Sequence, residues 1–413
     1  MSEVTWEITS LSELGTFSRG KSKHRPRNDA RLFEGGKYPL VQTGDVKAAN
    51  LYITKNDSYY NDFGLKQSKL WPAGTLCITI AANIAETAIL SYPMCFPDSI
   101  VGFNANPEKS SELFVYYFFE YIKKEIQKSA SGSIQDNINI DYLSKMRIKV
   151  PEKDYQDKIV EVLSSIDKKI LLNNQINQDL EAMAKTLYDY WFVQFDFPDQ
   201  NGKPYKSSGG KMVYNQDFKR EIPEGWGVDS LWNIANFYNG LPMQKYRPDT
   251  TEDDYLPVIK IREMMNGFSK DTEKARLDIP TEAVVERGDI LFSWSATLEV
   301  IIWGKERGAL NQHIFKVTSD TYPKSFIYFE LKSYLKVFKA IAELRKTTMG
   351  HITQDHLKQA KIVVPPIELI SKLDAKLQPI MLKQQMLENQ NQELTQLRDW
   401  LLPMLMNGQV KVE

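Results

Sequence analysis

The chain contains little cysteine and no long apolar run. Its two cysteines, Cys77 and Cys95, form no CxxC pair, so the sequence favours a reducing cytoplasm over a disulfide-rich secreted fold. No stretch approaches the roughly 18 apolar residues of a membrane helix. The N-terminus, MSEVTWEITS, has no basic segment followed by an apolar one, so we expect neither a membrane span nor a secretory signal.

An excess of either charge is also absent. Lys and Arg number 52 against 53 Asp and Glu, which gives a formal net charge of -1. This balance excludes a histone-like polycation but leaves room for local basic patches. With 42% hydrophobic residues in a chain of 413, we expect a globular protein of two or three domains.

Catalytic motifs are missing too. The four histidines form neither an HExxH motif nor a zinc-ligand spacing: His24, His313, His351 and His356. No glycine-rich loop has the pattern of an ATP or dinucleotide site. The pair Pro365–Pro366 follows Val364, whereas an amino-methyltransferase needs Asn or Asp there and an aromatic residue after the prolines. We therefore predict a protein without catalysis, cofactor or metal of its own.

Two distant parts of the chain resemble each other. The segment from Thr5, TWEITSLSELGTFSRG, matches GWGVDSLWNIANFYNG at a shift of 220, and the segment from Ile138, INIDYLSKMRIKVP, matches ITQDHLKQAKIVVP at a shift of 214. Asp141 and Asp355 recur within this match, and we expect them to act as a helix cap or turn rather than as catalytic carboxylates. The sequence therefore predicts a tandem duplication.

Each repeat has the same predicted order of elements: short strands, an amphipathic helix, a last strand and a long helix. The amphipathic helices are expected near 111–129 and 323–344. Residues 196–225 are rich in Gly, Pro, Asn and Ser, which favour turns, so we predict a linker there. The expected fold class is α+β, with two mixed α/β domains that are each followed by a long helix.

Both long helices carry an apolar seam in the same heptad frame. The seam positions are Ile159, Leu163, Ile166, Ile170, Asn173, Asn177, Leu180, Ala184, Leu187 and Trp191, and Leu373, Leu377, Ile380, Gln384, Leu387, Asn391, Leu394, Arg398, Leu401 and Leu405. Such seams predict an antiparallel coiled coil. Asn173, Asn177, Gln384 and Asn391 interrupt the seams, and we expect these buried amides to fix the register. The alternative is two ordinary amphipathic helices, each packed on its own domain.

Helix length and two prolines bear on what this pair does. Pro379 is expected to kink or restart the second helix, and Pro403 to end it near Leu402. From Ile159 to Trp191 the first helix spans about 50 Å at 1.5 Å per residue. Domains at opposite ends would lie about one or more turns of B-DNA apart, a turn being roughly 34–36 Å. We interpret the helices as a ruler.

Two groups of polar residues are candidates for contact with nucleic acid. Residues 18–31, SRGKSKHRPRNDAR, are expected to form a mobile basic loop that contacts phosphates through Arg19, Lys21, Lys23, Arg25 and Arg27, with a weaker counterpart in Lys245 and Arg247. The second group, between helix and strand in each repeat, has side chains suited to base edges: Ser133, Gln135, Asn137, Arg345, Lys346, Thr348 and His351. The alternative for both groups is an ordinary solvated surface.

Three segments carry a family resemblance. The segment from Leu171, LLNNQINQDLEAMAKTLYDYWFVQFD, resembles the central conserved region of the specificity subunit of type I restriction-modification enzymes. The segment from Arg220, REIPEGWGV, resembles the start of that family's second target-recognition domain. The segment from Leu397, LRDWLLPMLMNGQVKV, resembles its C-terminal conserved region. The resemblance covers nearly the whole chain.

The resemblance implies five parts: target-recognition domain 1 (1–151), a central conserved helix (152–195), a linker (196–225), target-recognition domain 2 (226–365), and a C-terminal conserved helix with its tail (366–413). Each half would read one part of a gapped target in double-stranded DNA. The helices would set the gap and dock two adenine-methylating modification subunits, and restriction subunits that hydrolyse ATP would join them. S-adenosylmethionine and ATP would be bound by these cytoplasmic partners.

Two alternatives stay open at this point. One is the specificity subunit of another restriction-modification type. The other is a duplicated helical adaptor that binds proteins and not DNA. The basic loop and the two mixed domains favour a DNA-reading protein over the adaptor.

Overall fold

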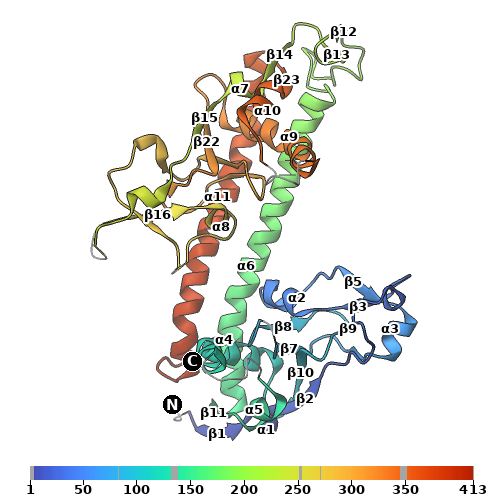
Figure 1. Ribbon diagram of the computed structural model, residues 1–413, viewed down its shortest axis with the longest axis vertical. Coiled ribbons are helices and arrows are strands. Elements are labelled where there is room, and N and C mark those ends of the chain that lie inside the picture. The colour runs from blue at the N-terminus through green and yellow to red at the C-terminus, as the bar shows by residue number, and fades with distance from the viewer. Residues whose placement is uncertain are drawn as a thin grey trace. The chain divides into compact units, whose positions relative to one another are not determined.

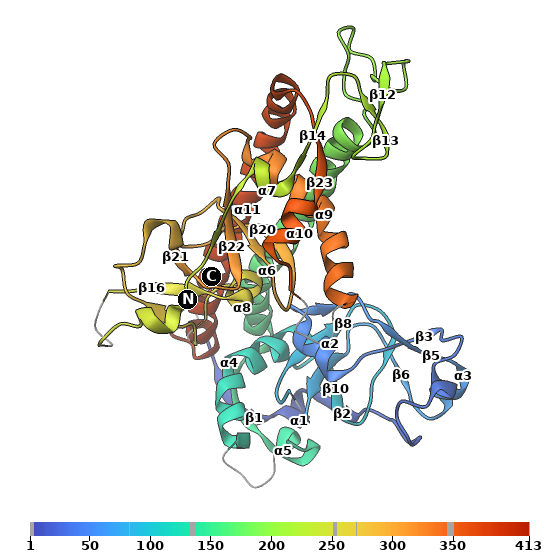
Figure 2. The same cartoon turned by 45° about the horizontal axis from the view of Figure 1, so that its top comes forward.

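The computed structural model describes residues 4–81, 83–131, 138–250, 254–269, 271–344 and 351–412, with side chains except at 129–131. It divides into two compact units. Unit 1 comprises Met1–Leu171 and Gln392–Glu413, and unit 2 comprises Leu172–Asn391. The two longest helices, α6 (Lys153–Tyr188) and α11 (Ile367–Met406), contribute residues to both units (Figure 1 and Figure 2).

Unit 1 combines short strands with one long amphipathic helix. Its strands are β1 (Trp6–Ser10), β2 (Gly15–Arg19), β3 (Tyr38–Leu40), β4 (Tyr52–Ile53), β5 (Ser58–Tyr60), β6 (Leu70–Trp71), β7 (Leu76–Thr79), β8 (Thr87–Leu90), β9 (Met94–Cys95), β10 (Ile100–Ala105) and β11 (Arg147–Pro151). Its helices, besides its share of α6 and α11, are α1 (Leu11–Leu14), η1 (Ala30–Leu32), α2 (Thr43–Ala48), α3 (Asp62–Lys66), α4 (Glu112–Ser131) and α5 (Ile140–Lys145).

The strands of unit 1 form two main sheets and a separate pair. The order β2-β10-β7-β8-β4 makes a five-stranded sheet, β5-β3-β9-β6 makes a four-stranded sheet, and β1 pairs antiparallel with β11. Helix α4 packs on β7, β8 and β10 of the larger sheet. It buries Phe114, Tyr117 and Phe118, whose spacing of three and four residues places them on one helix face.

Unit 2 has its own set of short strands and helices. The strands are β12 (Met212–Asn215), β13 (Arg220–Pro223), β14 (Gly227–Ser230), β15 (Asn236–Asn239), β16 (Leu256–Ile259), β17 (Lys274–Ala275), β18 (Val284–Val285), β19 (Ile290–Ser293), β20 (Glu299–Ile302), β21 (Gly308–Leu310), β22 (Ile314–Thr318) and β23 (Lys361–Val364). The helices, besides α6 and α11, are the π-helical η2 (Asp189–Val193), α7 (Leu231–Ile234), η3 (Met243–Tyr246), α8 (Ile261–Asn266), η4 (Thr281–Ala283), α9 (Lys324–Leu344) and α10 (Gln354–Gln359).

The strand order of unit 2 repeats that of unit 1. The sheet β15-β22-β19-β20 corresponds to β2-β10-β7-β8, the sheet β17-β16-β21-β18 corresponds to β5-β3-β9-β6, and the pair β14–β23 corresponds to β1–β11. In the sheets β5-β3-β9-β6 and β17-β16-β21-β18 the central pair is parallel, β3 with β9 and β16 with β21. The tandem duplication predicted from the sequence is confirmed.

The match between Gly20 and Gly240 has one structural cause in both units. Each backbone N–H donates to a strand carbonyl, that of Ile100 (2.9 Å) or Ile314 (3.1 Å). A Cβ atom would lie 2.0 Å from a backbone carbonyl oxygen at Gly20 and 2.3 Å from one at Gly240. Only glycine permits such a close approach as the chain leaves β2 and β15.

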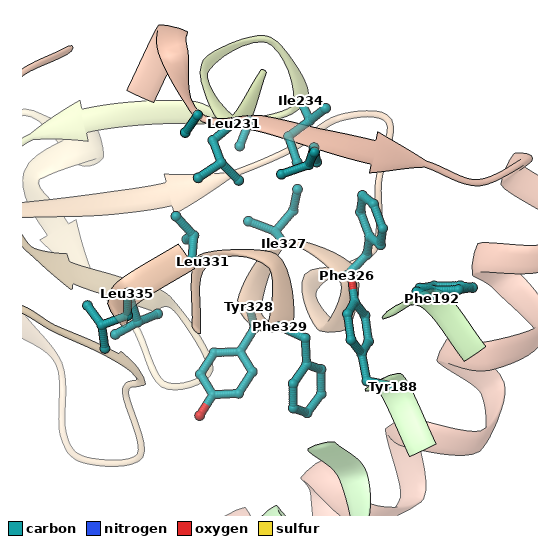
Figure 3. Close-up of a cluster of buried hydrophobic side chains, with 14 of the residues drawn as sticks. Tyr188, Phe192, Leu231, Ile234, Phe326, Ile327, Tyr328, Phe329, Leu331 and Leu335 are labelled. Carbon is teal, nitrogen blue, oxygen red and sulfur yellow. The ribbon is translucent and has the colours of Figure 1, made fainter. Parts of the chain in front are cut away.

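The core of unit 2 is built around α9 (Figure 3). On one side, Phe329 stacks on Tyr188 of α6 with ring centroids 5.0 Å apart, and Phe326 meets Phe192 of η2 at 6.1 Å. Leu231 and Ile234 of α7 lie over α9 in Figure 3 and are buried in the same cluster. The helix predicted near 323–344 therefore anchors the unit.

Residues 196–225 differ from the predicted linker. They contain the antiparallel hairpin β12–β13, and their apolar side chains Phe197 and Ile222 are buried in the same core as α9. The Phe197 ring also stacks on Trp226 at 5.1 Å. The turn-forming residues are present, but the apolar side chains between them fix the segment on unit 2.

Helix α11 contradicts the expected effect of its prolines. It runs without a break from Ile367 to Met406, so Pro379 does not restart it and the predicted end near Leu402 is wrong. Proline has a φ compatible with a helix, and its cost comes from the lost hydrogen bond and local crowding. Burial of Leu377 and Leu405 in the neighbouring turns offsets that cost.

The two matched carboxylates, Asp141 and Asp355, lie in the first turns of α5 and α10. The caps themselves are Asn139, whose side chain accepts from the Tyr142 N–H, and Thr353. An acid in the first turn is stabilised by the positive end of the helix dipole. They therefore belong to the helix start, two residues after each cap.

Candidate nucleic-acid interface and helix pair

Asp98 holds the basic segment that follows β2. Its carboxylate lies 2.6 Å from a guanidinium nitrogen of Arg27 and 3.7 Å from one of Arg25, and its carbonyl accepts from Nε of Arg19 at 2.7 Å. The side chains of Arg25 and Arg27 remain 55% and 50% exposed. The segment expected to be mobile is therefore tied at three points, and two of its cations already have a counter-ion.

A second acid, Asp29, shapes the other end of this segment. Its carboxylate accepts from the backbone N–H of Arg31 (3.0 Å), pairs with the Arg31 guanidinium (2.6 Å) and lies 2.8 Å from Nε2 of His24. Hydrogen bonds from Arg31, and then from His24, hold the pKa of Asp29 well below its ordinary value. Lys21 and Lys23 are exposed, and neither has an acidic partner among the described residues. They are the cations most available to a phosphate.

The weaker basic group of the second half occupies the equivalent place after β15. Lys245 lies in η3 and Arg247 follows it, and both are exposed. Of the second candidate group, His351 is described: it forms a β-bridge with Ser295, and its ring lies 6.2 Å from that of Trp294. The other members fall outside the described residues: Ser133, Gln135, Asn137, Arg345, Lys346 and Thr348.

The structure brings parts of the two candidate groups together. In unit 1 the Ile138 N–H donates to the Ile80 carbonyl (3.2 Å), and a cavity of about 370 Å³ at this place is lined by Arg19, Ile80, Ala81 and residues 138–141. In unit 2 the equivalent bond joins Ile352 to Trp294 (2.8 Å). Arg19 and the residues just after 137 therefore share one surface.

Amide side chains join α6 to α11 within unit 2. Nδ2 of Asn173 donates to Oε1 of Gln390 and to Oδ1 of Asn391, at 2.8 Å each, and the side chain of Asn173 is fully buried. Asn177 and Gln384 each donate to the other's backbone carbonyl, at 3.5 and 3.3 Å. Higher numbers on α6 meet lower numbers on α11, so the helices are antiparallel. The four amides predicted from the seams lie in this contact, and their role in setting the register stays a prediction.

In unit 1 the same helices are joined by an ion pair that the sequence did not reveal. Oδ1 of Asp167 lies 2.9 Å from Nη1 of Arg398, and its Oδ2 accepts from the Tyr117 hydroxyl at 2.6 Å. Asp167 is buried, and the heptad frame places Arg398 in the seam by its position alone. Burial, the Asp167 charge and this hydrogen bond together raise the pKa of Tyr117 far above its ordinary value, so its hydroxyl remains a donor.

The described part of the chain shows no metal site, no membrane helix and no reactive cysteine. No three His, Cys, Asp or Glu side chains within it gather in a way that could bind a metal ion. Over the same residues, no helix has both the length and the apolar character that a membrane crossing needs. Both cysteine thiols are buried, and burial raises the pKa of Cys95 to about 11, which makes it a poor nucleophile.

Residues 3–182 and 223–396 match the family model of the type I restriction modification DNA specificity domain. The chain belongs to this family. It is similar to the MjaIX specificity subunit of Methanocaldococcus jannaschii, with 25% identity over 99% of this chain and 94% of that one. The HindI specificity subunit of Haemophilus influenzae is 24% identical over 93% of this chain and 97% of its own. The crystal structure of a type I S subunit from M. genitalium has a TM-score of 0.57 at 15% identity, covers 98% of this chain and 97% of its own, and shares the fold.

The protein is therefore a DNA specificity subunit of a type I restriction-modification system, and such a subunit is non-catalytic within its complex. The resemblance drawn from the helix segments is confirmed, as are the duplicated α/β domains and the contact between their long helices. The two alternatives, another restriction type and an adaptor that does not bind DNA, are set aside.

Proposed function

We propose that each half of this specificity subunit reads one part of a two-part DNA target and that the paired helices set the unread gap. The halves would be target-recognition domains 1–151 and 226–365, with 152–195 and 366–413 as the helical spacer and 196–225 joining them. The observation that carries the proposal is the repeated strand order, because two copies of one scaffold carry different side chains at equivalent positions. Such copies are suited to two different short sequences.

In this proposal the basic segments contact phosphates and the residues near 138 and 352 contact bases. Lys21 and Lys23 would bind phosphates directly, whereas Arg25 and Arg27 would first exchange the Asp98 carboxylate for a phosphate. Lys245 and Arg247 would contact phosphates in the second half. The base contacts would come from the second group: Ser133, Gln135, Asn137, Arg345, Lys346, Thr348 and His351.

Salt dependence tests the phosphate role. Each phosphate contact contributes about 0.9 to the slope of log K against log salt concentration. Binding of the assembled complex to a duplex of unrelated sequence should lose about 1.8 from that slope when Lys21 and Lys23 are both replaced by Ala. The variant with Arg25 and Arg27 replaced should lose less, because Asp98 already neutralises part of their charge. An unchanged slope in the lysine variant would show that this segment does not contact DNA phosphates.

Matched insertions in both helices test the ruler. Seven residues placed between Asn174 and Gln175, with seven between Glu388 and Asn389, keep the heptad frame and the amide contacts on either side. They lengthen each helix by about 10 Å, or roughly three base pairs of B-DNA at 3.4 Å each. The gap in the methylated target should grow by about three base pairs while both half-sequences stay the same. A target methylated with the old gap would refute the ruler.

We further propose that the helices dock two methyltransferase subunits and that restriction subunits join this complex in the cytoplasm. Support comes from apolar side chains that α6 and α11 leave more than half exposed in unit 2: Leu172, Met183, Leu382 and Met386. Exposed apolar side chains on a helix suit a protein partner. Replacing Leu382 and Met386 by Ser should abolish co-purification with the methyltransferase subunits. The same replacement at Leu277, which is exposed and not part of α6 or α11, serves as the control.

A further inference from the structure

The two halves place different side chains on one equivalent stretch of backbone. Ile80 donates its N–H to the Ser99 carbonyl (3.0 Å), and Trp294 donates to that of His313 (3.3 Å). Together with the Ile138 and Ile352 bonds, this matches Ile80 with Trp294 and Ser99 with His313. The strand register matches Arg19 with Asn239, because Arg19 pairs with Val101 and Asn239 pairs with Phe315. The positions of unit 1 are Arg19, Ile80 and Ser99, and those of unit 2 are Asn239, Trp294 and His313.

In unit 2 these side chains join His351 in one cluster, which we call the Trp294 cluster. It comprises Asn239, Trp294, His313 and His351. The indole Nε1 of Trp294 donates to Oδ1 of Asn239 at 3.0 Å, and the Trp294 ring lies 5.6 Å from His313 and 6.2 Å from His351. Asn239 and His313 are exposed, whereas Trp294 and His351 are half-buried. The cluster thus has a packed aromatic base and an exposed polar rim.

The hydrogen bond from Trp294 fixes which way the Asn239 amide points. An indole N–H only donates, so Oδ1 must face the ring and Nδ2 must face away from it. No described residue accepts from Nδ2, and Oδ1 keeps a second lone pair. An amide in this state can donate to N7 of a purine and accept from the adenine amino group. Its orientation is set before any ligand arrives, which lowers the entropy cost of binding.

We infer that the Trp294 cluster is where the second half discriminates among base pairs, with Asn239 contacting a purine edge in the major groove and Trp294 positioning it. The inference rests on the proposed function and deepens it. Unit 1 carries Arg19 and Ile80 at the same place, beside a cavity of about 370 Å³. Unit 2 therefore presents an amide held by an indole, whereas unit 1 presents a guanidinium beside a cavity. The two halves select different bases.

The test measures discrimination one base pair at a time. Methylation mapping of the unchanged protein first supplies its target, and duplexes with single base-pair changes in either part then serve as probes for the assembled complex. Asn239→Ala should reduce discrimination at one position of one part by roughly 5- to 150-fold and leave the other part unchanged. Trp294→Phe keeps an aromatic ring but removes the N–H, so it should give a smaller loss at the same position.

Two matched variants separate recognition from folding. Asn236→Ala changes an exposed amide on the same strand that bonds Asp320 at 3.3 Å, and it should leave discrimination intact. His313→Ala removes an exposed ring and should affect the same position as Asn239→Ala or its neighbour. The inference is overturned if Asn239→Ala leaves every position unchanged or weakens all duplexes equally. If the unchanged protein supports no two-part target, the proposed function fails instead.

Discussion

Replacing Arg398 by Met removes one partner of the ion pair that joins α6 and α11 in unit 1. The carboxylate of Asp167 is 5% exposed and has two described partners, Arg398 at 2.9 Å and the Tyr117 hydroxyl at 2.6 Å. Burial alone would lower the pKa of Arg398, but its hydrogen bonds to Asp167 and Asp399 outweigh burial and raise it. The guanidinium is therefore charged at any working pH, and its loss leaves a buried carboxylate with one neutral donor.

The size of the effect follows from this burial. Removing one member of a buried ion pair typically costs about 3–5 kcal/mol in the free energy of unfolding. Because the Arg398 side chain is 27% exposed, water reaches the pair, and we expect the lower end of that range. A loss of about 3 kcal/mol corresponds to a fall of roughly 150-fold in the protection of amides that exchange by opening of unit 1.

Hydrogen exchange of the full chain, followed by mass spectrometry, measures this protection segment by segment. The segments to follow are α4 and the part of α6 before Leu171. Replacing both charges, as in Asp167→Leu with Arg398→Met, should recover most of the loss, because no buried charge remains. Lys145→Ala removes an exposed pair with Asp141, whose two side chains are 80% and 82% exposed, and should leave protection unchanged. Unaltered exchange in Arg398→Met, or a double variant as unstable as the single one, would refute the reasoning.

Three further predictions concern pH, register and charge. Burial raises the pKa of Glu330 to about 7. The contribution of Glu330 to the stability of unit 2 is therefore complete below the ordinary pKa of 4.5 and is lost as the pH rises through 7. Unit 2 should lose about 3 kcal/mol across that window, and Glu330→Gln should flatten the pH dependence of its melting temperature; a slope unchanged by the substitution would contradict this. Asn173→Ala removes a fully buried amide together with its hydrogen bonds to Gln390 and Asn391, and it should cost roughly 1–3 kcal/mol by hydrogen exchange in α6, which full protection would disprove. Asp98→Asn frees two arginines and should tighten binding of the complex to unrelated DNA at low salt, whereas weaker binding would show that the acid orients them for contact.

Features that repeat along the chain could be predicted from the sequence. The heptad seams are one case: all of the predicted seam positions on both helices are buried or half-buried, including Arg398. The glycine match is another, because Gly20 and Gly240 make the same close backbone approach. A pattern with a period of 3.5 residues implies a helix that packs along one face, and a repeat at a fixed shift implies the same local structure in both copies.

Contacts between residues far apart in the chain could not be predicted in this way. Arg27 and Asp98 are 71 residues apart, and Asp167 and Arg398 are 231 apart, with no local pattern that relates them. The sequence therefore predicts the basic segment but not Asp98, the acid that pairs with two of its arginines. The proline rule failed for the related reason that packing of α11 outweighs a local preference.

For one part of the site, the difference between the two halves could be predicted from the sequence. The match of Gly20 with Gly240 also aligns Arg19 with Asn239, and the shift of 214 aligns Ile80 with Trp294. These positions differ in side-chain chemistry, which is the expected signal of two readers on one scaffold. What the sequence lacked was the Trp294–Asn239 hydrogen bond, which marks the position as a prepared contact rather than a divergent surface.

The most direct measurement of the central claim is long-read sequencing of N6-methyladenine in the genome of the cell that carries this gene, with the gene intact and with it deleted. We predict a two-part, gapped motif that is methylated in the intact strain and unmethylated after deletion, and restored when the gene is supplied again. Exchanging residues 226–365 for those of a relative should change one part of the motif and keep the other. An identical set of methylated motifs in the intact and deleted strains would contradict the account.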